Sequence, residues 1–342
     1  MSSSCASADV KATRLVAGAL ALLLAACEAP LDLEAVQRQM AEPVRRSDLY
    51  QAAASGDGTV VVVGNQGVVL TSQDQAASWQ RTELPGWPAL IGVAHCPGGA
   101  FAALAADGQV WVSENGVSGN QGASWSPTVL ESEEAVQGIA CDAANRLWVV
   151  GSFSSIFSST DLGRNWSLFT LDEDIILTNV QFLDRDNGYV TGEFGTVLKT
   201  TDGGANWERL PDLPAEFYPQ AMHFSDVLHG RVVGLQGQVL LTTDGGRGWN
   251  AEATTTRAPL YGIAATDGAL YAVGGEGNIQ ELRNGHWRAV DHGKPIRLFL
   301  RLVHGLEDGR LLVGGQAGAL YVIDPAGSAA GSADRGAAVA GR

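Results

Sequence analysis

The sequence predicts an all-β fold, a seven-bladed β-propeller whose four-stranded antiparallel blades form one domain. The first observation is a repeated unit, a glycine-bounded turn followed by an apolar strand. It occurs seven times, with marker positions Gly67, Gly108, Ser154, Gly195, Gly237, Gly277 and Gly318. The second observation is the spacing of 40 to 46 residues between markers, which is the length of one blade. The third is the apolar character of both faces of the innermost strands, as expected for sheets packed between two neighbours.

The fourth repeat shows how one blade is built. Its inner strand is expected over Thr178–Leu183, its second strand begins over Gly188–Val190, its third covers Gly195–Thr200, and its outer strand starts at Trp207. Glycine in the turn before the third strand supplies a positive φ at no steric cost.

The seventh repeat is incomplete. Its strands are expected near Phe299–His304, Arg310–Val313 and Gly318–Ile323, after which no outer strand follows. Propellers remove an open edge by pairing the two ends of the chain across one blade. We therefore expect residues Pro43–Ser47 to supply the missing strand and close the ring.

The chain begins with an export signal, residues 1–26, in which Lys11 and Arg14 precede an apolar run too short to span a bilayer. Leu24-Ala25-Ala26-Cys27 resembles the bacterial lipobox, which implies that Cys27 carries the lipid. The prediction is therefore an exported protein, lipid-anchored to a cell-envelope membrane and facing the periplasm where there are two membranes. Residues 27–46 are expected to be the tether, with a short helix through Leu33, Val36 and Met40, and the closing strand. Residues 47–325 are the propeller, and 326–342 a disordered Ala/Gly/Ser-rich tail.

The charge balance excludes some partners. Against 22 Lys and Arg there are 37 Asp and Glu, a net charge of −15. Such a surface argues against nucleic acid and against electrostatic binding to anionic lipid. We expect a monomer without a cofactor.

Cys96 and Cys141 end the inner strands of adjacent repeats, at positions aligned as equivalent. An oxidising export compartment permits a disulfide between them. Two buried free thiols are the alternative, because adjacent inner strands can lie too far apart for bridge geometry.

The turn between the third and outer strands carries the most specific motif. It has the form Ser/Thr-x-Asp followed by Gly and Trp, as in Thr200-Thr201-Asp202-Gly203-Gly204-Ala205-Asn206-Trp207, and it resembles the Asp-box or bacterial neuraminidase repeat. The paired Asp and Trp positions are Asp161 and Trp166, Asp202 and Trp207, and Asp244 and Trp249. Weaker copies contain Asp74 with Trp79, Asn115 with Trp125, and Asn284 with Trp287. Each aspartate can cap its own turn, while each tryptophan fills a gap between blades. One carboxylate per turn is too few for calcium, so we expect no metal.

Two patterns of residues could indicate metal-binding or catalytic groups. His95, His223 and His304 align in one inner-strand column, but no carboxylate or cysteine column completes a metal site, so core or channel-lining histidines are expected. Sialidases use three arginines, a tyrosine and a glutamate, and they carry an Arg-Ile-Pro type string early in the chain. The string most similar to it here is Arg257-Ala258-Pro259, which comes late in the chain. The prediction is a protein without enzymatic activity.

Aromatic residues gather on the face opposite the Asp-containing turns. They are Trp87, Phe153, Phe194, Phe217 and Tyr218, in glycine turns or blade-to-blade linkers of successive blades. Exposed aromatics at this density suit a protein-binding patch. The alternative is that each side chain folds inward to cap its blade, which we favour for Phe153 and Phe194.

Together, the lipobox, the seven repeats and the Asp-containing turns resemble the photosystem II assembly and stability factors of plants and cyanobacteria and their bacterial relatives. The resemblance covers about residues 49–324. It implies a non-enzymatic propeller that binds a membrane or envelope protein complex and assists its assembly or stability. The arginine-rich docking surface of the phototroph members is not matched, because the arginines here are dispersed. Two further functions are considered: an accessory protein of a membrane exporter, and a glycan-binding or sialidase-like glycoside hydrolase.

Overall fold

The computed structural model describes residues 33–113, 124–214, 217–266, 268–293 and 295–325. The chain divides into two units, Met1–Glu42 and Pro43–Arg342. In the first, α2 (Leu33–Ala41) is the short helix expected from the sequence. Its first turn carries Glu34 and its last turn Arg38, which complements the helix dipole. The predicted signal, Cys27 and the predicted tail lie outside the described residues.

The second unit consists of consecutive antiparallel sheets. The first blade is β1 (Tyr50–Gly56), β2 (Thr59–Gly64), β3 (Val68–Ser72) and β4 (Gln80–Glu83). The second is β5 (Leu90–His95), β6 (Phe101–Ala105), β7 (Gln109–Ser113) and β8 (Ser126–Val129). The third is β9 (Val136–Cys141), β10 (Leu147–Gly151), β11 (Ile156–Ser159) and β12 (Ser167–Phe169). The fourth is β13 (Leu177–Phe182), β14 (Gly188–Gly192), β15 (Val197–Thr200) and β16 (Glu208–Arg209).

The remaining three blades follow the same order. The fifth is β17 (Pro219–Phe224), β18 (Gly230–Gly234), β19 (Val239–Thr242) and β20 (Asn250–Glu252). The sixth is β21 (Leu260–Thr266), β22 (Ala269–Gly274), β23 (Ile279–Arg283) and β24 (His286–Ala289). The seventh is β25 (Leu300–Gly305), β26 (Leu311–Gly315) and β27 (Leu320–Ile323). Short 3-10 turns precede the third strands of the last four blades: η1 (Glu193–Gly195), η2 (Leu235–Gly237), η3 (Gly275–Gly277) and η4 (Gln316–Gly318).

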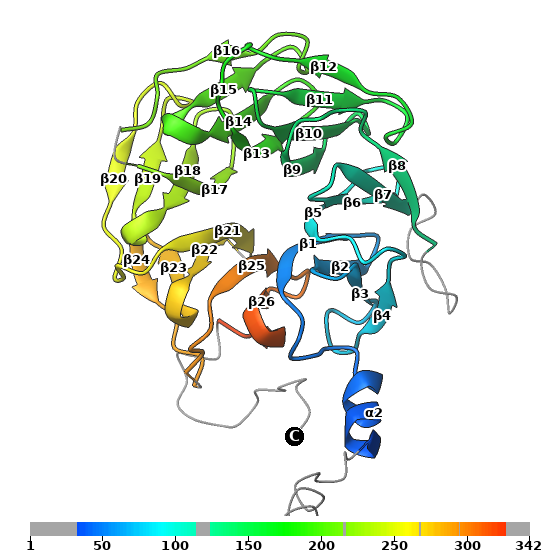
Figure 1. Ribbon diagram of the computed structural model, residues 1–342. Coiled ribbons are helices and arrows are strands. Elements are labelled where there is room, and N and C mark those ends of the chain that lie inside the picture. Colours follow the sequence, from blue (N-terminus) through cyan, green and yellow to red (C-terminus); the bar gives the residue numbers. More distant parts are fainter. Residues whose placement is uncertain (1–32, 114–123, 215–216, 267, 294, 326–342) are drawn as a thin grey trace, which may run out of the picture. The chain divides into compact units, whose positions relative to one another are not determined.

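The seven sheets form a closed ring (Figure 1). Each inner strand contacts the inner strands of both neighbouring blades, and β1 contacts β25 to complete the circle. The predicted seven-bladed propeller is therefore confirmed. The strand boundaries predicted for the fourth and seventh repeats agree with the structure to about two residues, within the usual uncertainty of strand ends.

Ring closure differs from the prediction in one detail. Within the described residues the seventh sheet has three strands, and residues 43–47 form no strand. They fold into a turn in which the Asp48 N–H donates to Arg45 O and the Arg45 N–H donates to the Asp48 carboxylate. These bonds occupy backbone groups that a ladder would need. In place of a strand ladder, a backbone hydrogen bond 2.7 Å long from the Gly318 N–H to Asp48 O joins the seventh blade to the segment before β1.

The two glycines of the repeated turn serve different purposes. In the fourth blade, Gly195 has a φ of +77°, the left-handed conformation that glycine adopts readily. Gly192 is extended, but a Cβ there would lie 2.6 Å from Ile176 O, where the chain enters the inner strand. The close approach accompanies a register shift between Leu177 and Asn179, and a shift at the same place occurs in every inner strand. The first glycine therefore permits this bulge.

The hydrophobic core consists of separate layers between neighbouring blades. Between the fourth and fifth blades, for example, the Tyr189 and Phe224 rings stack with centroids 3.7 Å apart, and Val197 and Leu213 pack against them. Each sheet is buried on both faces because it belongs to two layers. This arrangement explains why the second and third strands, such as β2 and β3, are apolar and buried, whereas outer strands such as β4 and β16 are polar and exposed.

We expect acid to destabilise the ring through a half-buried histidine, His304. The His304 Nε2 lies 2.8 Å from Ser55 Oγ, and burial lowers the pKa of His304 from 6.5 to about 4. Between these two values the unfolded chain binds a proton that the folded protein does not, so stability falls as pH drops and levels off below about pH 4. A shift of this size corresponds to roughly 3 kcal/mol at most. Urea unfolding across this pH range should show the fall, and His304→Gln should flatten it. An unchanged slope in the variant would contradict this role.

Candidate protein-interaction face

The antiparallel order of the strands gives the ring two distinct faces. The turns between second and third strands lie on the same face as the linkers that join successive blades. We call this the linker face. The Asp-containing turns, between third and outer strands, lie on the opposite face, which we call the Asp-turn face. Hydrogen bonds hold linkers and turns together, as where the Leu213 N–H donates to Gly195 O over 2.8 Å.

Large apolar side chains project from the linker face. Trp87 is 72% exposed, Phe153 52%, Phe194 73% and Tyr218 42%. The inward-packing alternative favoured for Phe153 and Phe194 is therefore wrong. Three of these residues have positive φ: 52° at Trp87, 51° at Phe153 and 56° at Phe194. A left-handed backbone is unfavourable for bulky residues, so the turn geometry holds these rings away from the core at an energetic cost.

Phe217 does not belong to this surface. It is only 6% exposed and packs in the layer between the fourth and fifth blades. Its ring lies beside Gly234, where an added Cβ would approach Phe217 Cζ to 2.9 Å. Neighbouring residues of an extended chain point to opposite sides, so burial of Phe217 directs Tyr218 outward. Phe217 is a core residue, and the predicted face loses one of its five members.

Leu235 is a member of the face that the sequence analysis missed. It occupies the first position of the η2 turn, directly before Gln236, and is 39% exposed. Attention to aromatic residues alone excluded it. The signal that could have found it is its place in the repeated turn, one residue before the position where Phe153 and Phe194 stand.

A continuous chain of hydrogen bonds links the central part of this face. Ser152 Oγ donates to Glu134 Oε2 over 2.6 Å, and Thr170 Oγ1 donates to Phe153 O over 2.8 Å. In the next blade, the Ile176 N–H donates to Glu193 Oε2 and Tyr218 Oη donates to Glu193 Oε1. The turns that carry Phe153 and Phe194 are thus fixed to the linkers on either side. The exposed rings are held by an ordered framework.

Charge is divided unevenly over the linker face. From the second to the fifth blade, the described linkers and turns carry acidic side chains and no Lys or Arg; the acidic residues are Asp107, Glu131, Glu133, Glu134, Asp172, Glu173, Asp174, Glu193 and Asp212. The nearby Arg209, at the end of β16, is paired with Glu173 and Asp212. On the other side of the ring, the corresponding segments mix both signs of charge: Arg45, Arg46, Arg257 and Arg297 with Asp48, Glu276 and Asp291. The exposed aromatic side chains Phe153, Phe194 and Tyr218 lie in the acidic half.

Comparison with known families matches residues 117–288 to the model described as "Photosynthesis system II assembly factor YCF48". This stretch is half of the chain. The chain belongs to the YCF48 family. No curated protein matches it.

Solved structures share the fold of this family member. YCF48 from Cyanidioschyzon merolae superposes with a TM-score of 0.68 at 16% identity, covering 82% of this chain and 96% of that one. A YCF48 bound to D1 peptide gives 0.68 at 14% identity, with 82% and 93% covered. A virginiamycin B lyase from Staphylococcus aureus with quinupristin gives 0.69 at 14% identity, with 80% and 94% covered. Propellers of this shape therefore include both assembly factors and an enzyme.

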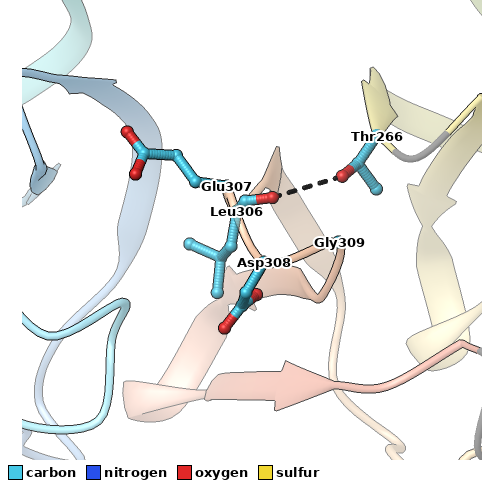
Figure 2. A pocket seen from close by; sticks show the side chains of 5 residues that line it. All are labelled: Thr266, Leu306, Glu307, Asp308 and Gly309. Carbon is cyan, nitrogen blue, oxygen red and sulfur yellow. Dashed lines mark hydrogen bonds between the residues drawn. The ribbon is translucent and has the colours of Figure 1, made fainter.

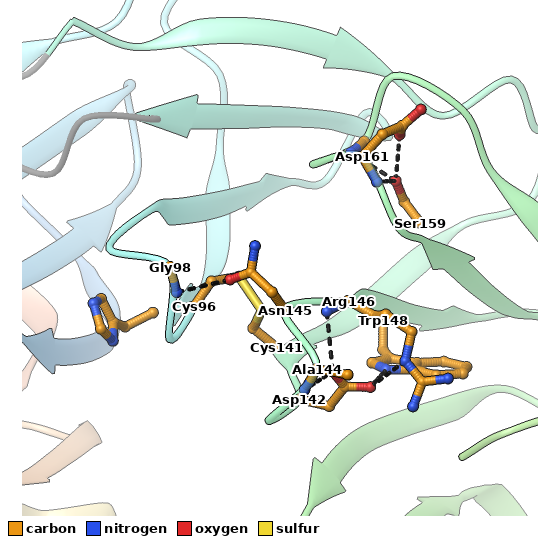
Figure 3. Close-up of a disulfide and its surroundings, with 12 residues drawn as sticks. Cys96, Gly98, Cys141, Asp142, Ala144, Asn145, Arg146, Trp148, Ser159 and Asp161 are labelled. Atoms are coloured by element: carbon orange, nitrogen blue, oxygen red, sulfur yellow. Dashed lines mark hydrogen bonds and ion pairs between the residues drawn. A yellow bond between two sulfur atoms is a disulfide. The ribbon is translucent and has the colours of Figure 1, made fainter. Parts of the chain in front are cut away.

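Cys96 and Cys141 of this YCF48-family protein form a disulfide between the second and third blades (Figure 3). Their Cα atoms are 5.2 Å apart. The two positions are not equivalent: strand pairing aligns Cys141 with His95, so Cys96 stands one residue further along. Beside the bridge, the Gly98 N–H donates to Asn145 Oδ1 over 2.8 Å and also joins the two blades.

The prediction that His95 shares an inner-strand position with His223 and His304 is wrong. His223 and His304 occupy equivalent positions, each paired one residue before the strand end. His95 is the last residue of β5 and packs against Phe101 with tilted rings whose centroids are 4.7 Å apart. A one-residue offset reverses the side of the sheet to which a side chain points. Among the residues that the structure describes, no three His, Cys, Asp or Glu side chains group as metal ligands.

The aspartates of the Asp-containing turns bind their own loops. In the three specific copies, the carboxylate accepts a backbone N–H from four residues further on: Asn165 to Asp161 at 2.9 Å, Asn206 to Asp202 at 3.0 Å, and Gly248 to Asp244 at 2.9 Å. Hydrogen bonds from Asn165 lower the pKa of Asp161 to about 2. The tryptophans pack between blades, Trp207 fully and Trp166 and Trp249 partly buried.

A small pocket opens on the Asp-turn face, with a volume of about 300 Å³ (Figure 2). Thr266, Leu306, Glu307, Asp308 and Gly309 line it. The Glu307 carboxylate accepts from Gln75 Nε2, and Asp308 pairs with Arg310 at 2.6 Å. The bonds to Gln75, from Glu307 and from Arg310 Nη2 to Gln75 O at 3.0 Å, link the seventh blade to the first. In the described part of the chain, no helix is long and apolar enough to cross a membrane.

Proposed function

We propose that this YCF48-family protein is a non-enzymatic scaffold that binds a membrane or envelope protein complex and assists its assembly or stability. The observation that carries the proposal is the set of exposed rings on the linker face: Trp87, Phe153, Phe194 and Tyr218. Rigid aromatic side chains on a fixed framework supply much of the energy of protein–protein contacts. A YCF48 with a bound D1 peptide supports the idea that propellers of this family hold segments of a partner protein.

The arginines offer little support for a sialidase-like activity. Binding of an acidic sugar would need several guanidinium groups free to face the ligand. Here Arg81 pairs with Asp48, Arg146 with Asp142 and Arg231 with Glu252, all within or beside their own blades. Their geometry serves the fold, which favours the scaffold over the glycan-binding alternative.

The proposal includes export and a lipid anchor at Cys27, supported by the signal and lipobox of the sequence. The anchor would hold a monomeric ring beside its membrane partner. Membrane fractionation of the Cys27→Ser variant tests this part separately: the variant should leave the membrane fraction.

Removing exposed rings should weaken partner binding. In pull-downs from detergent-solubilised membranes, Trp87→Ala/Phe194→Ala should lower recovery of the partner complex by about tenfold or more, the effect of losing a binding hot spot. Val227→Ala/Leu228→Ala is the matched control, because these residues are 38% and 49% exposed but lie on the Asp-turn face. Equal recovery with both double variants would contradict the linker face as the binding surface. Identification of the partner by mass spectrometry would show whether it is an exporter.

A further inference from the structure

The acidic half of the linker face combines apolar anchors with carboxylates in one ordered surface. We call this surface the crescent, and it consists of Phe153, Phe194, Tyr218, Glu131, Glu133, Asp172 and Asp174. The backbone positions of these residues are linked. Ser154 Oγ donates to Glu173 O over 3.1 Å, and the Ser154 N–H donates to Ile175 O over 2.8 Å. These bonds place Asp172 and Asp174 beside the turn that presents Phe153. The Ser152 bonds to Ala135 and Glu134 do the same for Glu131 and Glu133.

The carboxylates of the crescent are exposed and carry uncompensated charge. Among the contacts of the described residues, no ion pair involves Glu131, Glu133, Asp172 or Asp174. The nearest guanidinium, that of Arg209, is already held by Glu173 and Asp212. Glu134 and Glu193 are used to fix the turns. Four negative charges therefore lie on the crescent without an ion pair to any cation of the described residues.

The combination of exposed carboxylates and exposed rings determines which kind of partner segment the crescent can bind. Complementary charge steers association and suppresses wrong partners, because like charges brought together are costly. An acidic segment would be repelled, and a second copy of this chain would bring its own acidic half to the same place. A segment with Lys or Arg between apolar side chains would place cations on the carboxylates and over the ring faces, and apolar groups against Phe153 and Phe194.

We propose that the crescent binds a basic, apolar segment of the partner, in an extended conformation. This inference rests on the proposed function and deepens it, because it names the class of segment that the scaffold recognises. On the other side of the ring, Arg46, Arg257 and Arg297 lie among the acidic Glu276 and Asp291, and Arg45 pairs with Glu83. These mixed charges attract a basic segment less than the crescent does, so the crescent is the favoured location on the face.

The test uses the whole chain with Cys27→Ser and two labelled synthetic peptides. One contains lysines spaced between leucines and phenylalanines with serine and glycine linkers, and the other has glutamate in place of each lysine. Fluorescence anisotropy should show the lysine peptide binding at least about tenfold more tightly at low ionic strength. The preference should shrink at about 0.5 M salt, where exposed charges are screened. Equal binding of the two peptides would overturn the proposal.

Charge-neutral variants locate the site. Asp172→Asn/Asp174→Asn should weaken the lysine peptide about three- to tenfold, the range for losing two exposed ion pairs, and Phe153→Ala/Phe194→Ala should weaken it about tenfold or more. Asp186→Asn/Glu276→Gln removes two exposed acidic groups outside the crescent and should leave binding unchanged. An effect of equal size in this control would overturn the assignment, as would self-association of the wild-type chain through the crescent. If the membrane partner is still captured while the peptides are not distinguished, only this inference fails. If the membrane partner is not captured and the two peptides bind equally, the proposed function fails as well.

Discussion

Asp48→Ala is expected to lower the free energy of unfolding by about 3–5 kcal/mol, the cost of breaking a buried ion pair by removing one partner. Asp48 is 2% exposed. Its carboxylate accepts from Arg81 Nη1 and from Tyr50 Oη, each at 2.8 Å. Burial, followed by the charge of Asp48, raises the pKa of Tyr50, so the phenol keeps its proton. Without the carboxylate, the guanidinium of Arg81 would remain largely buried without its main counter-charge.

The same residue closes the ring, because Asp48 O accepts the Gly318 N–H of the seventh blade. Urea unfolding of the variant measures the loss. Glu83→Ala is the control: Glu83 also pairs with Arg81, at 2.8 Å, but its side chain is 41% exposed. An exposed pair contributes about 1 kcal/mol or less. Equal effects of the two substitutions would contradict a special role for Asp48.

Loss of the disulfide is the second large effect. Cys96 and Cys141 are 45 residues apart, and releasing a loop of this length should cost about 4 kcal/mol, because the unfolded chain regains conformational freedom. Cys96→Ser/Cys141→Ser should therefore unfold at a clearly lower urea concentration than the wild type, and the wild type with reductant should behave like the variant.

A thiol count provides the control for the disulfide. The denatured, unreduced protein should give no reaction from Cys96 or Cys141, and both should react after reduction. Reactive thiols before reduction, or unfolding that does not depend on reductant, would contradict the bridge.

The repeat period was enough to predict the ring, because each blade obeys the same local rules. Positive φ at the marker glycine and apolar residues on both sheet faces are properties of short segments. The direction of single side chains depends on register, which a one-residue offset reverses. For this reason the sequence alone aligns His95 with the wrong column and predicts Phe217 on the surface with Tyr218.

Other features depend on contacts between distant segments. The turn at Arg45–Asp48 replaces a closing strand because the side chain of Asp48 binds Arg81, more than thirty residues away. The exposure of Phe153 and Phe194 follows from backbone conformation in turns whose neighbours are linkers of adjacent blades. The acidic half of the linker face becomes visible only when the scattered carboxylates of three linkers are brought together by the ring.

The most direct test of the scaffold account is photo-crosslinking in intact membranes, with a photoreactive amino acid placed at Phe194 on the linker face or at Val227 on the Asp-turn face. Both positions are exposed, so each probe can reach solvent and partners. The account predicts a specific crosslink to a membrane or envelope protein from position 194 and none from position 227. The same crosslink from both positions, or one from position 227 alone, would contradict it.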